Sequence, residues 1–172
     1  QRTILETWQA SIETDVSDVA QFRDPAPPVV APQLRAAAKQ VVQGRPVDMS
    51  AQALEDLAGS LEDAAAAIED YPLADAIRDQ GFGLTADQIL SARSEFVLAL
   101  RAYRQAALLL ATAEATDDPE LAAAIGERTT ELLDGADALL AEAHRKYVVA
   151  LSAAGIRTVD QPAGAGGLLP TG

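Results

Sequence analysis

A three-residue pattern, Leu-Glu-Asp or Ile-Glu-Asp, occurs three times at intervals of seven residues. The three copies begin at Leu54, Leu61 and Ile68. Seven residues make two turns of an α-helix, so these apolar residues form a seam along one face, as in a heptad repeat. Ser50 precedes the repeat and is a suitable N-cap. The pattern therefore predicts a helix that follows Ser50 and extends to Asp70.

Apolar residues recur in steps of three and four along much of the remaining chain, and β-branched residues never alternate over the length of a strand. We expect further helices over residues 3–23, 33–43, 86–115 and from Pro119 to Gly155. The inward face of the helix over 86–115 is predicted to carry Ile89, Phe96, Leu100, Tyr103, Ala107 and Leu110. The sequence thus predicts an all-α fold, an antiparallel up-down helical bundle of about four long helices.

Proline and glycine mark the predicted breaks. Residues 25–32 contain four prolines and favour a stiff extended connector. A kink at Tyr71-Pro72, with a short helical continuation to Gln80, would leave one of the long helices broken. We assign residues 1–158 to a single bundle domain and residues 159–172, rich in glycine and proline, to a flexible tail.

Other local signals concern the ends and the interior of the helices. Gly44 is expected to stop the helix over 33–43, and Asp118 with Pro119 to start the last helix. Gly126 and Gly135 lie inside that last helix, where each costs up to about 1 kcal/mol relative to alanine. They mark either a close helix crossing or a weak point.

Composition excludes several classes of function. The chain of 172 residues has 13 Lys and Arg against 26 Asp and Glu, no cysteine and one histidine. It cannot form thiolate or His-rich metal sites, and a net charge of −13 opposes binding to nucleic acid. No nucleophile, phosphate-loop or dinucleotide motif is present. We therefore expect no enzyme activity, no catalytic residues, no cofactor and no metal.

The lone histidine has a structural interpretation. The close helical neighbours of His144 include no carboxylate that could orient it as a general base. We interpret it as a helix-end histidine beside Arg145 and Lys146, favoured by the helix dipole.

The acidic residues of the seven-residue repeat are the first candidate site. They either dock a basic partner or collect cations, or they form a solvated helix flank that pairs in part with Arg93, Arg101 and Arg104. The solvated, partly paired flank is the simpler interpretation, because charged residues beside a heptad seam usually face solvent. The residues of this acidic stripe are Glu55, Asp56, Glu62, Asp63, Glu69 and Asp70.

Four aromatic residues are the second candidate site. Trp8, Phe96, Tyr103 and Tyr147 would line a pocket between helices, or they would simply pack in the core. Tyr103 is the most informative of them, because its hydroxyl needs a partner if it is buried.

The sequence favours a non-catalytic interaction or sensing module that binds a protein or a small molecule. The chain starts at Gln1 without an initiator methionine, which suggests the extracytoplasmic part of a secreted or membrane-anchored protein. A basic bundle end with Arg2, Arg145, Lys146 and Arg157 would suit a membrane surface. The alternative is a cytosolic regulatory or scaffold bundle that pairs through the acidic heptad helix. The first hypothesis predicts a monomer beside a membrane, or at most a weak dimer, and the second predicts an oligomer or a stable protein partner.

Overall fold

A computed structural model of the chain describes residues 30–70 and 85–153. Most of these residues are helical, and none of them lies in a strand. The helices are α2 (Val30–Val42), α3 (Ala51–Asp70), α5 (Thr85–Glu114) and α6 (Pro119–Ala153). The predicted all-α class is confirmed. The predicted helix over 3–23, the kink at Tyr71-Pro72 and the tail over 159–172 lie outside the described residues.

The predicted capping residues begin two of the helices. The Ser50 hydroxyl accepts a hydrogen bond of 3.2 Å from the backbone N–H of Ala53 at the start of α3. The Asp118 carboxylate accepts bonds of 3.0 and 3.2 Å from the backbone N–H groups of Glu120 and Leu121. These side chains satisfy N–H groups that have no acceptor within the helix. Both predicted starts are confirmed.

The bounds of α2 correct one prediction. The helix begins at Val30, not at Gln33, so Pro32 belongs to its first turn and not to an extended connector. The first four N–H groups of a helix have no acceptor within it, so proline at the third position removes no hydrogen bond. At its other end, Gly44 adopts a φ of 63° and ends the helix as predicted.

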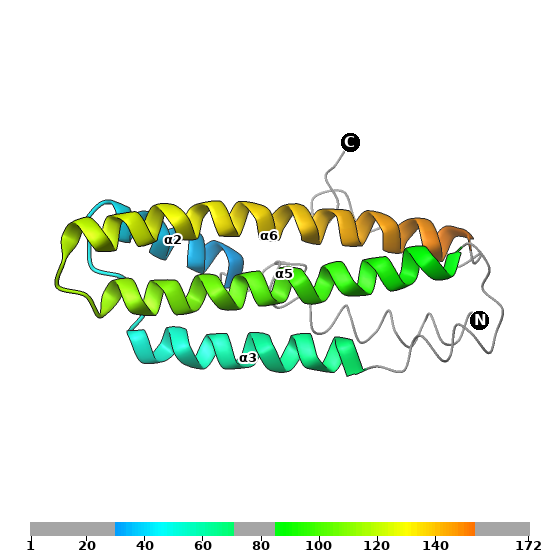
Figure 1. Cartoon of the computed structure of the whole chain (residues 1–172), viewed down its shortest axis with the longest axis horizontal. Helices are drawn as coiled ribbons and strands as arrows, with labels where there is room; N and C mark the ends of the chain where they lie inside the picture. Colours follow the sequence, from blue (N-terminus) through cyan, green and yellow to red (C-terminus); the bar gives the residue numbers. More distant parts are fainter. Residues whose placement is uncertain (1–29, 71–84, 154–172) are drawn as a thin grey trace.

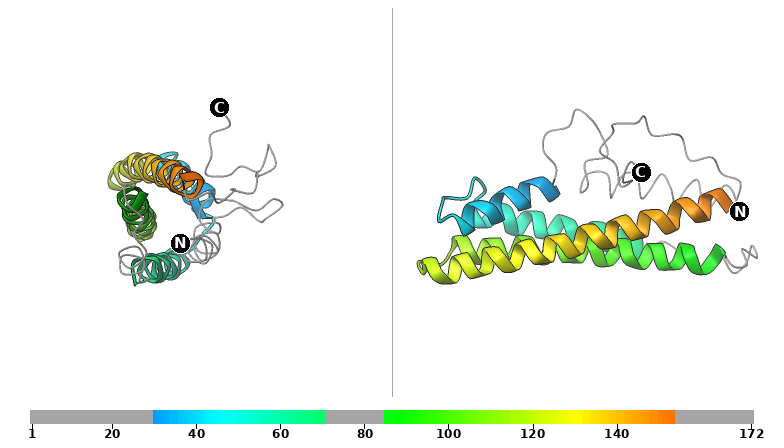
Figure 2. Two further views of the ribbon diagram at one scale, coloured as in Figure 1. Left: turned by 90° about the vertical axis from the view of Figure 1, so that its right-hand side faces the viewer. Right: turned by 90° about the horizontal axis from the view of Figure 1, so that it is seen from above.

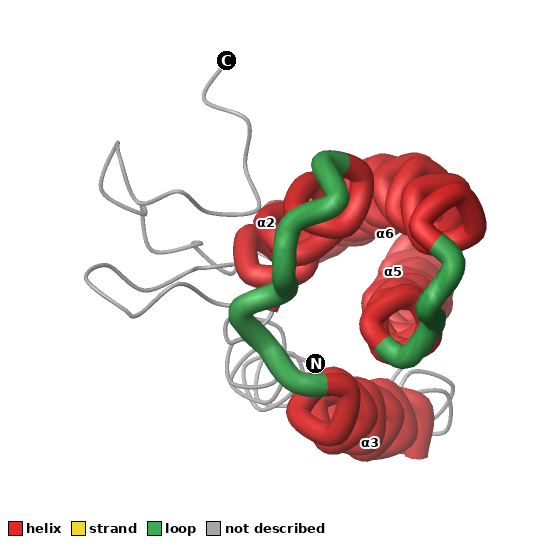
Figure 3. The backbone as a smooth tube through the Cα atoms, turned by 90° about the vertical axis from the view of Figure 1, so that its left-hand side faces the viewer, coloured by secondary structure: helices red, strands yellow, loops and turns green. Residues whose placement is uncertain are grey.

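Helix α5 is the central element, because it contacts α2, α3 and α6. It lies beside α6 over most of its length, and the two run in opposite directions from the short loop that joins them (Figure 1). Helix α3 covers another side of α5, and the short α2 lies against α6 (Figure 2). Seen from the end, the connection from α2 to α3 passes across the bundle (Figure 3).

The core follows the predicted apolar faces. Leu54, Leu61 and Ile68 are buried, so the heptad seam packs inside the protein. All six residues predicted for the inward face of α5 are also buried. Along the same helix, α5 also buries the small residues Ala92, Ala99, Ala106 and Ala113. Alanine at such positions allows neighbouring helix backbones to approach closely, as we expect in a core that is poor in aromatic residues.

Of the helices that the structure describes, α5 is the one that is long and apolar enough, by length and composition alone, to cross a membrane. The core helix of a soluble protein passes the same test, and 56% of its most apolar stretch is buried inside the protein. Arg101 and Arg104 lie within α5 and form ion pairs with Glu62 of α3. The apolar character of α5 therefore fits its place in the core.

Candidate functional site

The acidic stripe forms two rows on α3. Each Asp follows a buried seam residue by two positions, which places it about 200° around the helix, on the outward side. Each Glu follows by one position and lies about 100° around, on a flank. We call Asp56, Asp63 and Asp70 the Asp row, and Glu55, Glu62 and Glu69 the Glu row. All three members of the Asp row are exposed.

The Glu row faces arginine side chains of α5. Arg101 forms ion pairs with Glu69 at 2.6 Å and Glu62 at 3.5 Å, and Arg104 pairs with Glu62 at 3.3 Å. These side chains remain about half exposed, so each pair adds little to stability. The Asp row forms no ion pair within the described residues, although Asp56 accepts a hydrogen bond of 2.9 Å from Gln52. Pairing with α5 thus accounts for Glu62 and Glu69, whereas Glu55 and the Asp row form no ion pair within the described residues.

The predicted aromatic residues do not gather in one place. Phe96 and Tyr147 meet edge to face, with ring centroids 6.3 Å apart, and both are buried. Tyr103 lies seven residues along α5 from Phe96, about 10 Å farther along the helix axis. Trp8 lies outside the described residues. Phe96 and Tyr147 therefore pack in the core, while Tyr103 belongs to a separate polar cluster.

That cluster, which we call the Tyr103 cluster, joins three helices. The buried Tyr103 hydroxyl of α5 donates a hydrogen bond to Asp137 of α6. Arg35 of α2 donates to the second oxygen of Asp137 at 2.5 Å and to Asp134 at 2.9 Å. The prediction that a buried Tyr103 needs a partner is confirmed. Asp137, Asp134 and Arg35 were not predicted, because no local pattern connects residues so distant in sequence.

The protonation states of Tyr103 and Arg35 in this cluster are fixed at neutral pH. Burial, together with the hydrogen bond to Asp137, raises the pKa of Tyr103, so its hydroxyl stays protonated at neutral pH. Burial alone would lower the pKa of Arg35, but its bonds to Asp137 and Asp134 outweigh burial and raise that pKa. Neither group is poised to transfer a proton near pH 7, and the cluster acts as a structural tie.

A second polar cluster connects α5 and α6. The Lys146 ammonium donates to Glu95 and, at 2.9 Å, to the hydroxyl of Ser91. A serine beside a lysine amine resembles the arrangement of a nucleophile and its base. Here the hydrogen bond to Glu95 raises the pKa of Lys146, so the amine keeps its proton and cannot activate Ser91. The second carboxylate oxygen of Glu95 is buried without a hydrogen-bond partner in the described part of the chain.

Two of the four residues expected at the basic end of the bundle, Arg145 and Lys146, pair with glutamates of the described chain. Arg145 donates two hydrogen bonds to Glu142, at 2.6 and 2.8 Å, and these lower the pKa of Glu142 to about 2. Lys146 pairs with Glu95. Arg2 and Arg157 lie outside the described residues. A free cationic patch that would attract a membrane surface therefore gains no support from Arg145 and Lys146.

The interpretation of His144 as a helix-end histidine is wrong. Helix α6 continues to Ala153, so His144 lies more than two turns from its end, too far for a strong dipole effect. Its Nε2 atom is buried and has no hydrogen-bond partner among the described residues. Burial lowers the pKa of His144 from 6.5 to about 4, so the ring is neutral at pH 7. Its ring packs against Tyr147, at 6.2 Å between centroids.

This burial predicts how stability depends on pH. The unfolded chain takes up a proton at His144 near pH 6.5, while the folded chain resists it until about pH 4. The contribution is therefore present above pH 6.5 and is lost as the pH falls toward 4. Between about pH 7.5 and pH 5, we expect the free energy of unfolding to fall by about 1–2 kcal/mol more in the parent than in His144→Leu. Urea denaturation at both pH values measures this, and equal losses would contradict the buried neutral state.

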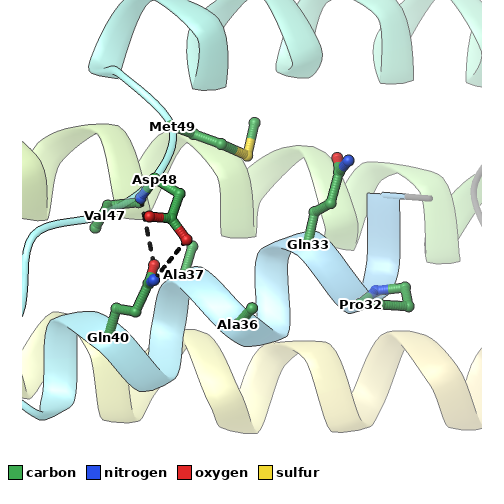
Figure 4. A pocket seen from close by; sticks show the side chains of 8 residues that line it. All are labelled: Pro32, Gln33, Ala36, Ala37, Gln40, Val47, Asp48 and Met49. Atoms are coloured by element: carbon green, nitrogen blue, oxygen red, sulfur yellow. Dashed lines mark hydrogen bonds between the residues drawn. The ribbon is translucent and has the colours of Figure 1, made fainter. Parts of the chain in front are cut away.

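A pocket of about 390 Å³ lies between α2 and the loop that follows it. Figure 4 shows Gln33 at one end and hydrogen-bonded Gln40 and Asp48 at the other, with the Met49 side chain extending between them. Ala36 and Ala37 contribute to its apolar wall. Its volume is in the range of small-molecule sites, and the pocket is open to solvent on the side of Ala36 and Asp48, which are exposed. The sequence carried no signal for it, because its walls come from separate turns of a helix and a loop.

Across residues 30–70 and 85–153, no group of three or more His, Asp or Glu side chains is arranged to hold a metal ion. No protein-family model, curated protein or solved structure matches this chain. The function must therefore be argued from its own side chains.

Proposed function

We propose that this protein is a non-catalytic helical-bundle module that binds a basic protein partner through the Asp row of α3. The observation that carries the proposal is the separation of the two acidic rows. Arginines of α5 neutralise part of the Glu row, while the Asp row is exposed and forms no ion pair with any described residue. Helix α3 itself contains six acidic residues and no basic one. Its outward face therefore attracts a complementary basic surface.

The position of the seam favours binding through this polar face. Leu54, Leu61 and Ile68 are at most 2% exposed, because they pack in the core. Pairing with a second helix through the heptad seam, one form of the scaffold alternative, would first have to remove α3 from α5. The Asp row needs no such rearrangement. We therefore favour a monomeric module over a coiled-coil oligomer, and sedimentation of the protein distinguishes the two.

We propose in addition that residues 1–158 complete one antiparallel up-down bundle. This arrangement includes the helix predicted over 3–23 and the short continuation to Gln80 after the predicted kink, and it leaves residues 159–172 as the tail. The opposite directions of α5 and α6, joined by a short loop, support this topology. Protease cleavage confined to the predicted breaks and tail would agree with it, and early cleavage within residues 3–23 would not.

The binding proposal is tested with a defined basic helix. An alanine-based peptide with lysine at every seventh position repeats its charges every ~10.5 Å, which matches the Asp row. A peptide of the same composition with clustered lysines is the comparison. We expect the matched peptide to bind more tightly in fluorescence anisotropy, and its affinity to fall as salt increases.

Two triple variants with the same change in net charge complete the test. Asp56→Asn/Asp63→Asn/Asp70→Asn removes the Asp row, and we expect at least a tenfold loss of affinity for three lost charge pairs. Glu114→Gln/Asp117→Asn/Glu127→Gln removes three exposed charges elsewhere and should retain binding. Equal binding by the two variants, or by the two peptides, would reduce the interaction to nonspecific charge attraction and overturn the proposal.

The cellular location of the protein is a separate proposal. We propose that the module acts outside the cytoplasm, in a secreted or membrane-anchored protein, and fractionation of the native host tests this. Recovery from the membrane or the medium agrees with the proposal. Recovery as part of a soluble cytosolic chain favours the regulatory scaffold.

A further inference from the structure

The pocket beside α2 has a simple electrostatic character. Its lining includes one acidic residue, Asp48, and no Lys or Arg. The net charge of the chain is −13, so the surrounding field adds to the negative potential of this carboxylate. A pocket of this kind repels anions and attracts cations.

The Asp48 carboxylate is held in position by Gln40. The Gln40 amide nitrogen donates a hydrogen bond of 2.7 Å to Oδ2 of Asp48, and its oxygen accepts one of 3.4 Å from the Asp48 backbone N–H (Figure 4). The second oxygen, Oδ1, accepts no hydrogen bond from the described residues. Each carboxylate oxygen can accept more than one hydrogen bond, so Asp48 keeps the capacity to accept from a charged N–H donor.

The apolar part of the pocket sets the size of the ligand. Gln33 and Gln40 are seven residues apart on α2, a separation of about 10 Å along the helix axis. Between them lie Ala36 and Ala37, and the Met49 side chain extends toward Gln33 (Figure 4). Methionine adapts its shape to the ligand it contacts. This length accommodates an alkyl chain of about four carbons with a charged group at the Asp48 end.

We propose that this pocket binds a small organic cation, an ammonium group on a short alkyl chain. The ammonium donates a hydrogen bond to the Asp48 carboxylate, and the alkyl chain packs on Ala36, Ala37 and Met49. The proposal concerns α2 and its following loop, so it does not depend on the partner proposed for the Asp row.

The single methionine of the chain provides a direct test. In protein labelled with [¹³C-methyl]methionine, the methyl resonance of Met49, identified by its loss in Met49→Leu, reports on the pocket. We expect n-butylammonium to shift this resonance in a saturable way in the millimolar range. The neutral analogue n-butanol and the anion n-butyrate, which have alkyl chains of similar length, should give no saturable shift.

A matched pair of variants tests the role of the carboxylate. Asp48→Asn should raise the half-saturation concentration of n-butylammonium about tenfold, as expected for loss of one charge-assisted hydrogen bond. Asp56→Asn is the control, because Asp56 also accepts from a glutamine, Gln52, but does not line this pocket. It should leave the titration unchanged.

Three results would overturn the proposal: no shift with n-butylammonium, an equal shift with n-butanol, or identical titrations of the two variants. The circular dichroism spectrum establishes whether Asp48→Asn is folded. If it is not, the comparison of n-butylammonium with n-butanol and n-butyrate on the parent protein decides the question alone.

Discussion

Replacement of Asp137 by alanine should lower the free energy of unfolding by about 2–3 kcal/mol. The buried Tyr103 hydroxyl loses its acceptor, and Arg35 loses the shorter of its two ion pairs. An unsatisfied buried hydroxyl costs more than the hydrogen bond itself was worth, because its lost hydration is not recovered. Urea denaturation at neutral pH measures the change.

Asp134→Ala is the matched control for this prediction. Asp134 lies on the same helix and bonds to the same arginine, but its side chain is 66% exposed. We expect a loss of less than about 1 kcal/mol. The double variant Tyr103→Phe/Asp137→Ala should recover part of the Asp137→Ala loss, since the stranded hydroxyl is gone. If the two aspartate variants lost the same stability, the ion pairs of Arg35, and not the Tyr103 hydroxyl, would account for the effect.

Gly126→Ala is the second substitution with a large expected effect. An added Cβ would lie 2.8 Å from Cγ2 of Val42, 3.0 Å from Cγ1 of Val41 and 3.2 Å from the carbonyl oxygen of Ala38. The carbonyl belongs to the backbone of α2, so α2 must move away from α6. We expect a net destabilisation of about 1–2 kcal/mol in thermal or urea unfolding, even though alanine favours the helix itself.

The same substitution at Gly135, nine residues farther along α6, should change the stability in the opposite direction. A Cβ at this position meets no atom within 4 Å. Gly135→Ala should therefore stabilise the protein by about 0.5–1 kcal/mol, the intrinsic helix preference of alanine. If both variants were stabilised, α2 would be free to shift on α6 without cost, contrary to the close crossing at Gly126.

Local signals in the sequence predicted the elements whose causes are local. Capping by Ser50 and Asp118, and the seven-residue seam, identified α3 and the start of α6 because each depends on residues within two turns. Pro32 misled the prediction of α2, because the same residue suits both an extended connector and the first turn of a helix. Gly126 and Gly135, the two glycines inside α6, looked alike in the sequence, and the approach of α2 distinguishes them.

Interactions between distant residues could not be predicted in this way. A partner for Tyr103 was expected, but Asp137 lies 34 residues away on another helix. Arg35 and Asp134 are 99 residues apart. His144 was placed by its basic neighbours in the sequence, whereas its pKa is set by burial. Each of these interactions depends on which helices pack together and through which faces. The periodicity of apolar residues does not determine this pairing.

The two acidic rows of α3 bear on how this sequence can diverge. Glu69 and Arg101 can exchange their charges and retain their ion pair if Glu62, which also pairs with Arg101, changes with them. The Asp row has no such partner among the described residues, so a binding function alone would keep its negative charge in descendant sequences. In related sequences, we would then expect paired charge reversals between the Glu row and α5, and conserved acidic residues in the Asp row. This pattern would indicate that one repeat has both a structural and a binding role.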